Sequence, residues 1–330
     1  MPRHPVALPA LILLALALPA AAQASAPDVL VLDARGQVRT QQDRFLPSPA
    51  RSELPPPGLV TPKPVAPPAA ERAGTALVRS TVPSRLRALA RSGKLSAGDA
   101  RDYASAYANA RRTVRRLKGS PRAELAAVLR NAEAQASDGL LTASRVKVVL
   151  MTVKRNAQWW GTNGPLAYGR RIRFDGSRLV WQSYPGQGVQ IQWLGTFGRM
   201  NQLFLAKGYD TEVGAMAREI ESYAVNRAGG KAWEYQFVFG GGRPPWVSGL
   251  AQGTALQAFS RAAVRLKDPH WFDVARSGLG IFRTPPPSGV RIRAREGAHY
   301  LAYSYAPGQR IYNAFLQSVV GLHDLSLIHI

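Results

Sequence analysis

The sequence contains no cysteine. This absence excludes disulfide bonds, thiolate metal sites and thiol nucleophiles, and it also excludes the cysteine that anchors a bacterial lipoprotein. The spacing of the histidines matches no metal site, and we expect neither a metal nor a cofactor. A Gly-x-Ser-x-Gly nucleophile elbow is absent too, and no Lys-Ser/Thr pair follows residues 240–242, so neither a serine hydrolase nor a phosphate-binding loop is indicated.

Acidic residues are scarce: 20 Asp and Glu stand against 43 Lys and Arg, which gives a formal net charge of +23. A charge of this size attracts polyanions, namely nucleic acid, anionic lipid or acidic polysaccharide. Arg112, Arg115 and Arg116 share one face of a predicted helix at the i, i+3, i+4 spacing. An arginine-rich coding bias with solvated basic faces would produce the same numbers. The charge therefore permits an acidic-glycan partner without identifying it, and the sequence does not indicate an oligomeric state.

Residues 1–24 have the features of a secretory signal peptide. Arg3 and His4 form a short polar start, an apolar stretch runs from Val6 to Leu18, and the alanines that follow offer cleavage sites. The apolar stretch is too short for a membrane span, although an uncleaved N-terminal anchor is the alternative. We therefore expect a secreted or periplasmic cell-envelope protein with no membrane span after cleavage, and export argues against nucleic acid as the partner.

The rest of the chain divides by composition. Residues 25–80 are rich in Pro and Ala and predict a largely disordered linker, in which Val29–Leu32 is compatible with an edge strand. Residues 81–160 show helical periodicity, with helix starts expected at Ser96 and Thr142. Residues 161–325 mix helices with short hairpins. Residues 326–330 resemble translated adapter sequence, and we expect the natural chain to differ there and to continue.

Strand signals are confined to short segments. Asp175-Gly176 predicts the turn of a hairpin that joins residues 172–174 to residues 179–181. Further strands are expected at residues 233–239, 289–293 and 300–305. Because strands and helices do not alternate as βαβ units, a doubly wound sheet is disfavoured. We predict a mainly α protein: an incomplete α/α toroid with short antiparallel β-hairpins at one rim.

The predicted strand at residues 300–305 contains Tyr300, Tyr303 and Tyr305, for which we expect one shared face, and Arg310 follows closely. Arginine holds a carboxylate through two parallel hydrogen bonds, and a tyrosine serves as acid or base where a cation lowers its pKa. Such a face suits a uronate. An aromatic ladder that packs in the core fits the same spacing.

Two motifs together resemble the C-terminal domain of the D-glucuronyl C5-epimerases, which invert C5 of a uronic acid within a polysaccharide. The family's Trp-x-Ser-x-x-Ala-Gln-Gly pattern is matched by Trp246, Ser248, Ala251, Gln252 and Gly253. Residues 299–315 align without a gap with a second family segment, and residues 321–324 continue the match, which covers roughly residues 244–325. Tyr300 and Tyr303 fall on the family's tyrosines, and Asn313 falls on its asparagine.

This resemblance implies that the protein removes and returns the C5 proton of uronates in an acidic polysaccharide. It implies Tyr303 as acid or base and Asn313 as the residue that orients the carboxylate. The expected substrate-binding residues are Tyr300, Tyr305, Arg310, Gln252 and Trp246, the last by packing or by stacking on a sugar.

The family's two glutamates are replaced by Leu301 and Ala302, and Ala302 cannot carry the proton that the second glutamate carries in the animal enzymes. We therefore expect a divergent bacterial member. His299, whose ordinary pKa lies near neutrality, is a candidate substitute base, and a packing role is its alternative. Two other functions stay open: a non-catalytic protein for acidic-glycan binding or envelope assembly, and a uronate polysaccharide lyase, which starts from the same proton abstraction.

Overall fold

The computed structural model describes residues 26–47 and 80–328. The signal-peptide prediction lies outside these residues, as do linker residues 48–79. Helices make up about half of the protein, so the mainly α prediction is confirmed. The toroidal arrangement of those helices stays a prediction. Within the described ranges, no helix is both long enough and apolar enough to cross a membrane.

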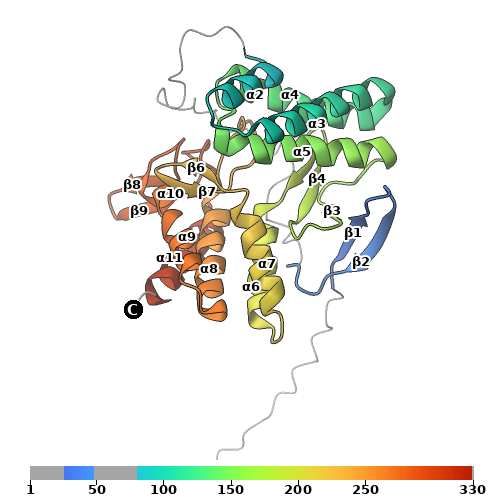
Figure 1. Cartoon of the computed structure of the whole chain (residues 1–330). Helices are drawn as coiled ribbons and strands as arrows, with labels where there is room; N and C mark the ends of the chain where they lie inside the picture. The colour runs from blue at the N-terminus through green and yellow to red at the C-terminus, as the bar shows by residue number, and fades with distance from the viewer. Residues whose placement is uncertain (1–25, 48–79, 329–330) are drawn as a thin grey trace, which may run out of the picture.

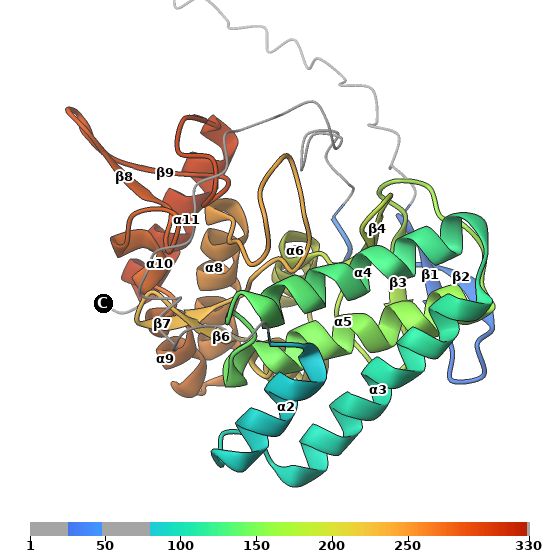
Figure 2. The same ribbon diagram turned by 90° about the horizontal axis from the view of Figure 1, so that it is seen from above.

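The first four described helices form one layer across the top of Figure 1, and α3, α4 and α5 pack side by side in Figure 2. Their bounds are Val82–Arg91 (α2), Ala97–Arg116 (α3), Gly119–Ser137 (α4) and Ala143–Thr162 (α5). The predicted cap at Ser96 is confirmed, because its hydroxyl accepts a hydrogen bond from the backbone N–H of Asp99 at 3.0 Å. Thr142 begins α5 as predicted, but its side chain makes no capping hydrogen bond.

A five-stranded sheet lies beside these helices in the order β2-β1-β3-β4-β5. The strands are β1 (Asp28–Leu32), β2 (Val38–Gln42), β3 (Arg171–Phe174), β4 (Trp181–Tyr184) and β5 (Gly188–Ile191). The predicted hairpin is β3–β4, but its second strand begins at Trp181 and not at residue 179, and Gly176 in the connection has φ +75°.

The apolar run Val29–Leu32 forms a strand as expected, but it is not at the edge, because β1 pairs antiparallel with β2 and parallel with β3. Val29 and Val31 are buried against Val180 and Leu46. Residues 26–47, which the sequence assigned to a linker, are therefore part of the sheet in this structure, and the sheet is not purely antiparallel.

The C-terminal half consists of helices that run down from the upper layer in Figure 1, together with two small hairpins. The helices are α6 (Trp193–Leu205), α7 (Asp210–Glu221), α8 (Gly249–Leu266), α9 (His270–Ser277), α10 (Gly280–Arg283) and α11 (Tyr312–Ile328). The hairpins are β6 (Val225–Arg227) with β7 (Gly230–Ala232), and β8 (Arg291–Ala294) with β9 (Gly297–Tyr300).

Helices α8 and α11 lie so close together that glycine is required at their contact. A Cβ added to Gly253 would come within 2.6 Å of the Cα of Ser318, and one added to Gly321 would overlap the backbone of Gly253. The glycine that ends the Trp246–Gly253 motif therefore serves helix packing.

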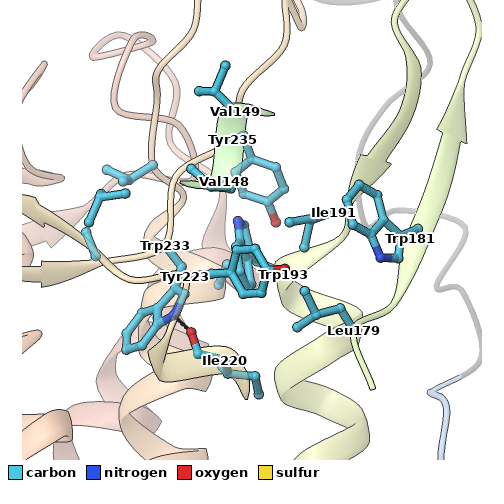
Figure 3. Close-up of a cluster of buried hydrophobic side chains, with 14 of the residues drawn as sticks. Val148, Val149, Leu179, Trp181, Ile191, Trp193, Ile220, Tyr223, Trp233 and Tyr235 are labelled. Carbon is cyan, nitrogen blue, oxygen red and sulfur yellow. Dashed lines mark hydrogen bonds between the residues drawn. The ribbon is translucent and has the colours of Figure 1, made fainter. Parts of the chain in front are cut away.

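The main core lies between the upper helices, the sheet and the C-terminal helices. Figure 3 shows Trp193 and Trp233 near its centre, with Val148, Ile220 and Ile191 around them. Both indoles are fully buried, and each N–H reaches a backbone carbonyl: Trp193 that of Glu234 and Trp233 that of Ile220, both at 2.9 Å. These bonds satisfy the polar atoms that burial would otherwise leave without a partner.

The strand predicted at residues 233–239 does not form. Only two isolated bridges occur there, Tyr235 with Trp246 and Phe239 with Gly242. The aromatic alternation that predicted a strand arises instead from a segment whose side chains are nearly all buried, including the polar Glu234. This segment is therefore held by the packing of side chains on both of its sides, and not by hydrogen bonds to a neighbouring strand.

Candidate active site

The loop after β9 is fixed against the segment that precedes α8. The backbone N–H of Gly249 donates to the carbonyl of Leu301 at 3.0 Å. Two further bonds join Val247 and Ser304: the N–H of Ser304 donates to the carbonyl of Val247 at 3.0 Å, and the hydroxyl of Ser304 accepts from the N–H of Val247 at 3.2 Å. The two sequence motifs therefore meet in space, which is what positions Tyr303 and Tyr305.

The expectation of three tyrosines on one strand face is wrong. The strand β9 ends at Tyr300, and Tyr303 and Tyr305 lie in the loop that follows. Tyr300 is also three residues from Tyr303, an odd separation that would place the two on opposite faces of a strand. Tyr300 instead contacts Phe282 and Phe315, with ring centroids 5.2 and 6.1 Å away.

Tyr303 and Tyr305 belong to a group of four tyrosines that we call the tyrosine cluster: Tyr168, Tyr184, Tyr303 and Tyr305. The rings of Tyr303 and Tyr305 stack with centroids 5.4 Å apart and an interplanar angle of 20°. Phe239 connects this pair to Tyr184, with ring centroids 6.0 Å from Tyr303 and 6.1 Å from Tyr184. Tyr184 in turn meets Tyr168 edge to face at 5.9 Å.

Exposure differs sharply across the cluster. Tyr168 is 38% exposed, whereas Tyr303 and Tyr305 are each 4% exposed. Neither Tyr303 nor Tyr305 donates or accepts a side-chain hydrogen bond within the described part of the chain. The cluster therefore has a solvent-facing rim at Tyr168 and two deeper phenols whose hydroxyl groups have no partner among residues 26–47 and 80–328.

The electrostatic setting of these phenols is opposite to the one expected from the sequence. Burial raises the pKa of Tyr303, and repulsion from Tyr168 raises it further. Burial also raises the pKa of Tyr305, with a smaller contribution from Tyr303. No cation offsets either shift among the described residues. Both side chains are therefore neutral phenols at neutral pH, which suits proton donation better than proton abstraction.

A second cluster lies where β9 meets α11, and we call it the histidine face: His299, Tyr300, Arg310 and Phe315. The imidazole of His299 stacks on Phe315 with centroids 4.8 Å apart and an interplanar angle of 9°. Burial, and then the nearby charge of Arg310, lowers the pKa of His299, so the ring is neutral at pH 7. Its buried Nε2 atom has no hydrogen-bond partner.

The predicted site residues thus separate into two groups. Tyr303, Tyr305 and Trp246 are in mutual ring contact, whereas Tyr300 and Arg310 lie on the histidine face. Arg310 is exposed and donates to the carbonyl of Pro307 at 2.6 Å. Asn313 is exposed in the first turn of α11, and its side chain makes no hydrogen bond to another described residue.

Gln252 and Trp246 have structural roles, because both make buried contacts with other parts of the protein. The amide of Gln252 donates to the carbonyl of Trp233 at 2.9 Å and accepts from the N–H of the same residue at 3.4 Å. Trp246 is 1% exposed, stacks on Tyr235 at 4.3 Å, and donates its indole N–H to the carbonyl of Phe237 at 2.8 Å. Of the two roles expected for Trp246, this is the packing role.

Sequence reasoning missed a buried ion triad that supports this region. Glu234 accepts two hydrogen bonds of 2.8 Å from Arg145 and one of 2.7 Å from Arg227. Arg227 also donates to the carbonyl of Pro245 at 3.3 Å, directly before Trp246. Burial opposes ionisation of Glu234, but the two guanidinium groups outweigh it and hold its pKa at about 2. The triad joins α5 and β6 to the segment that carries the first motif.

Sequence reasoning also missed Tyr168 and Tyr184, because more than a hundred positions separate them from Tyr303 and no local pattern connects the two regions. Throughout residues 26–47 and 80–328, histidines and carboxylates do not gather into a group that could hold a metal ion.

Comparison with known proteins agrees with the two motifs. The family described as the D-glucuronyl C5-epimerase C-terminus matches residues 229–329. A D-glucuronyl C5-epimerase from Caenorhabditis elegans is 32% identical over 88 residues, which is 26% of this chain and 14% of that enzyme. The match thus spans a small part of the length of its relative. The family match includes Trp246, Tyr303 and Asn313, and it confirms over residues 229–329 the resemblance to the C-terminal domain of the D-glucuronyl C5-epimerases.

Proposed function

We propose that this protein is exported and acts as a C5-epimerase-like enzyme on a uronate-containing polysaccharide, with its C-terminal helices belonging to an α/α toroid. One observation carries the proposal. The loop that lies within the epimerase match presents two stacked phenols, Tyr303 and Tyr305, whose hydroxyl groups make no hydrogen bond to described residues. Hydroxyl groups without a protein partner are available to a substrate.

The chemistry follows from the proton that has to move. The C5 hydrogen lies next to a carboxylate, and when a base removes it the electron pair of the C–H bond spreads onto that carboxylate. Donors aimed at the carboxylate stabilise this charge. Return of a proton to the opposite face of C5 completes the inversion. Because Tyr303 is a neutral phenol with a raised pKa, we assign it the return: its O–H bond breaks as the new C5–H bond forms.

A base is needed on the other face of the sugar. Ala302 cannot serve, and His299 stacks on Phe315 with its Nε2 atom buried, which fits the packing role, so we assign the abstraction to none of the described residues. Arg310 and Asn313 are exposed beside the histidine face and are assigned to the uronate carboxylate. After the return step, the phenolate of Tyr303 regains a proton from solvent, and the proton removed from C5 passes to solvent.

A second function is favoured by a specific observation. Ala302 replaces a catalytic glutamate, and only 4% of Tyr303 is exposed. Both facts suit a protein that binds acidic glycan and no longer performs the reaction.

Incubation of the protein with glucuronate-containing polysaccharides in heavy water separates the candidates. Deuterium at C5 of the recovered glycan supports the epimerase-like function. Binding without deuterium supports the non-catalytic alternative, and an unsaturated product that absorbs in the near ultraviolet identifies a lyase.

A further inference from the structure

A cavity of about 410 Å³ opens among α2, α3 and α4. In Figure 2, α2 and α3 lie on the opposite side of the molecule from the β8–β9 hairpin and α11, and α4 crosses between them. Apolar and aromatic groups contribute part of the wall, from Tyr107, Val114 and Leu129. Three arginines give the wall its positive charge: Arg111 and Arg115 are one turn apart on α3, and Arg130 comes from α4.

These arginines have no anion of their own. All three side chains are exposed, and none forms a hydrogen bond or ion pair with another described residue. The carboxylate in the cavity wall, Glu133, is already engaged, since it accepts from the hydroxyl of Tyr107 and from the backbone N–H of Val82 at 3.3 Å. Three positive charges therefore face one hollow with a single carboxylate, which is committed to two other donors.

We propose that this cavity is an anchoring subsite that binds a carboxylate or sulfate group of an acidic polysaccharide, away from the tyrosine cluster. The planar guanidinium groups match such oxyanions through paired hydrogen bonds. The apolar wall suits the C–H face of the sugar that carries the anion, and the volume lies in the range of small-molecule sites. A concave site also suits a flexible chain better than a flat lipid surface.

The inference rests on the proposed function, which supplies the acidic polysaccharide as ligand. It also explains why arginines gather on the surface of α3. A polysaccharide held at one point is presented to a second site on the same molecule at a raised effective concentration. The subsite would therefore favour long chains over short ones.

The test compares two triple variants that each remove three positive charges. The first is Arg111→Gln, Arg115→Gln and Arg130→Gln. The control is Lys207→Gln, Lys267→Gln and Arg283→Gln, three exposed cations without partners among the described residues and outside the cavity. Dissociation constants are measured at one fixed ionic strength for a heparin oligosaccharide, an unsulfated glucuronate polysaccharide and duplex DNA. Thermal unfolding verifies that both variants remain folded.

We expect the cavity variant to bind the glycans at least about tenfold more weakly, which is about 1.4 kcal/mol, and the control to change binding less than about threefold. Loss of heparin binding alone assigns the site to sulfate, and loss of both glycans assigns it to the carboxylate. Equal losses in the two variants, or unchanged binding in the cavity variant, would overturn the proposal. So would tighter binding of DNA than of either glycan, lost on mutation of the cavity.

The outcome is separable from that of the proposed function. If the parent protein fails to exchange deuterium at C5 but the cavity variant still loses glycan binding, the enzyme proposal fails and the subsite stands. If the parent exchanges deuterium and the cavity variant binds glycan normally, the subsite alone fails.

Discussion

Gly242 lies against the ring of Tyr305 so closely that no side chain fits between them: a Cβ at this position would come within 3.0 Å of three ring atoms. We predict that Gly242→Ala displaces Tyr305 and disturbs its stack on Tyr303. Overpacking of this kind costs about 1–3 kcal/mol of stability, and we expect the glycan-directed activity to fall by more than that loss of folded protein explains.

The control for this prediction is Gly308→Ala in the neighbouring loop, where an added Cβ meets no atom within 4 Å. It should leave stability and activity near the parent values. Activity and chemical denaturation are measured on both variants, and parent-like activity in Gly242→Ala would mean that the position of Tyr305 does not matter.

Glu234 should be essential to the fold. Replacement by Gln leaves Arg145 and Arg227 buried without their counter-charge, and breaking a buried pair in this way costs about 3–5 kcal/mol. Asp210→Asn is the control, because its pair with Arg265 is exposed at the carboxylate, where 61% of the side chain is accessible. That change should cost less than about 1 kcal/mol. Urea unfolding measures both, and similar losses in the two variants would contradict the role given to the triad.

Because the pKa of Glu234 is lowered in the folded protein, we expect the free energy of unfolding to depend on pH. Its pKa is about 2 in the folded protein, below the ordinary value of 4.5. The contribution of Glu234 is thus fully present above pH 4.5 and is lost as the pH falls through 2. The shift corresponds to about 3 kcal/mol. In Glu234→Gln the free energy of unfolding should decrease less between pH 5 and pH 2 than in the parent. A parent and variant with parallel pH profiles would show that the triad does not hold this pKa down.

Replacement of glycine by alanine should have opposite effects on stability at the α8–α11 contact and in α5. Gly253→Ala places a Cβ 2.6 Å from the Cα of Ser318 and should destabilise the protein by about 1–3 kcal/mol. Gly161→Ala, in α5, adds a methyl group only 3.5 Å from Thr113, an ordinary contact, and should stabilise by about 0.5–1 kcal/mol because alanine favours helix. Melting temperatures measure both, and a gain of stability in Gly253→Ala would refute the close packing.

Local signals predicted the helices well. The Ser96 cap depends on neighbouring residues alone, and α3 begins where it indicated. The hairpin turn at Asp175-Gly176 was equally local. The parallel pairing of β1 with β3 was not predictable in this way, since Leu30 meets Ile172 across a long stretch of intervening chain.

The candidate site shows the same limit. The two motifs identified the loop with Tyr303, and the fold brings that loop to Val247. Spacing alone did not separate Tyr300 from Tyr303, because strand β9 ends between them. Spacing also did not reveal Tyr168, because only tertiary packing brings it close to Tyr303.

The central claim is that Tyr303 returns a proton to C5 of a uronate, and inversion of C5 with uptake of deuterium measures it most directly. Glucuronate polysaccharide in heavy water should gain deuterium at C5 with the parent protein. Tyr303→Phe keeps the ring and loses no hydrogen bond to a described residue, so its stability should stay within about 1 kcal/mol of the parent. Its rate of inversion at C5, measured as formation of the deuterated C5 epimer, should fall at least about a hundredfold. Tyr223→Phe, a buried tyrosine outside the tyrosine cluster, is the control and should exchange normally. Inversion at the parent rate in Tyr303→Phe, or no inversion in the parent, would contradict the account.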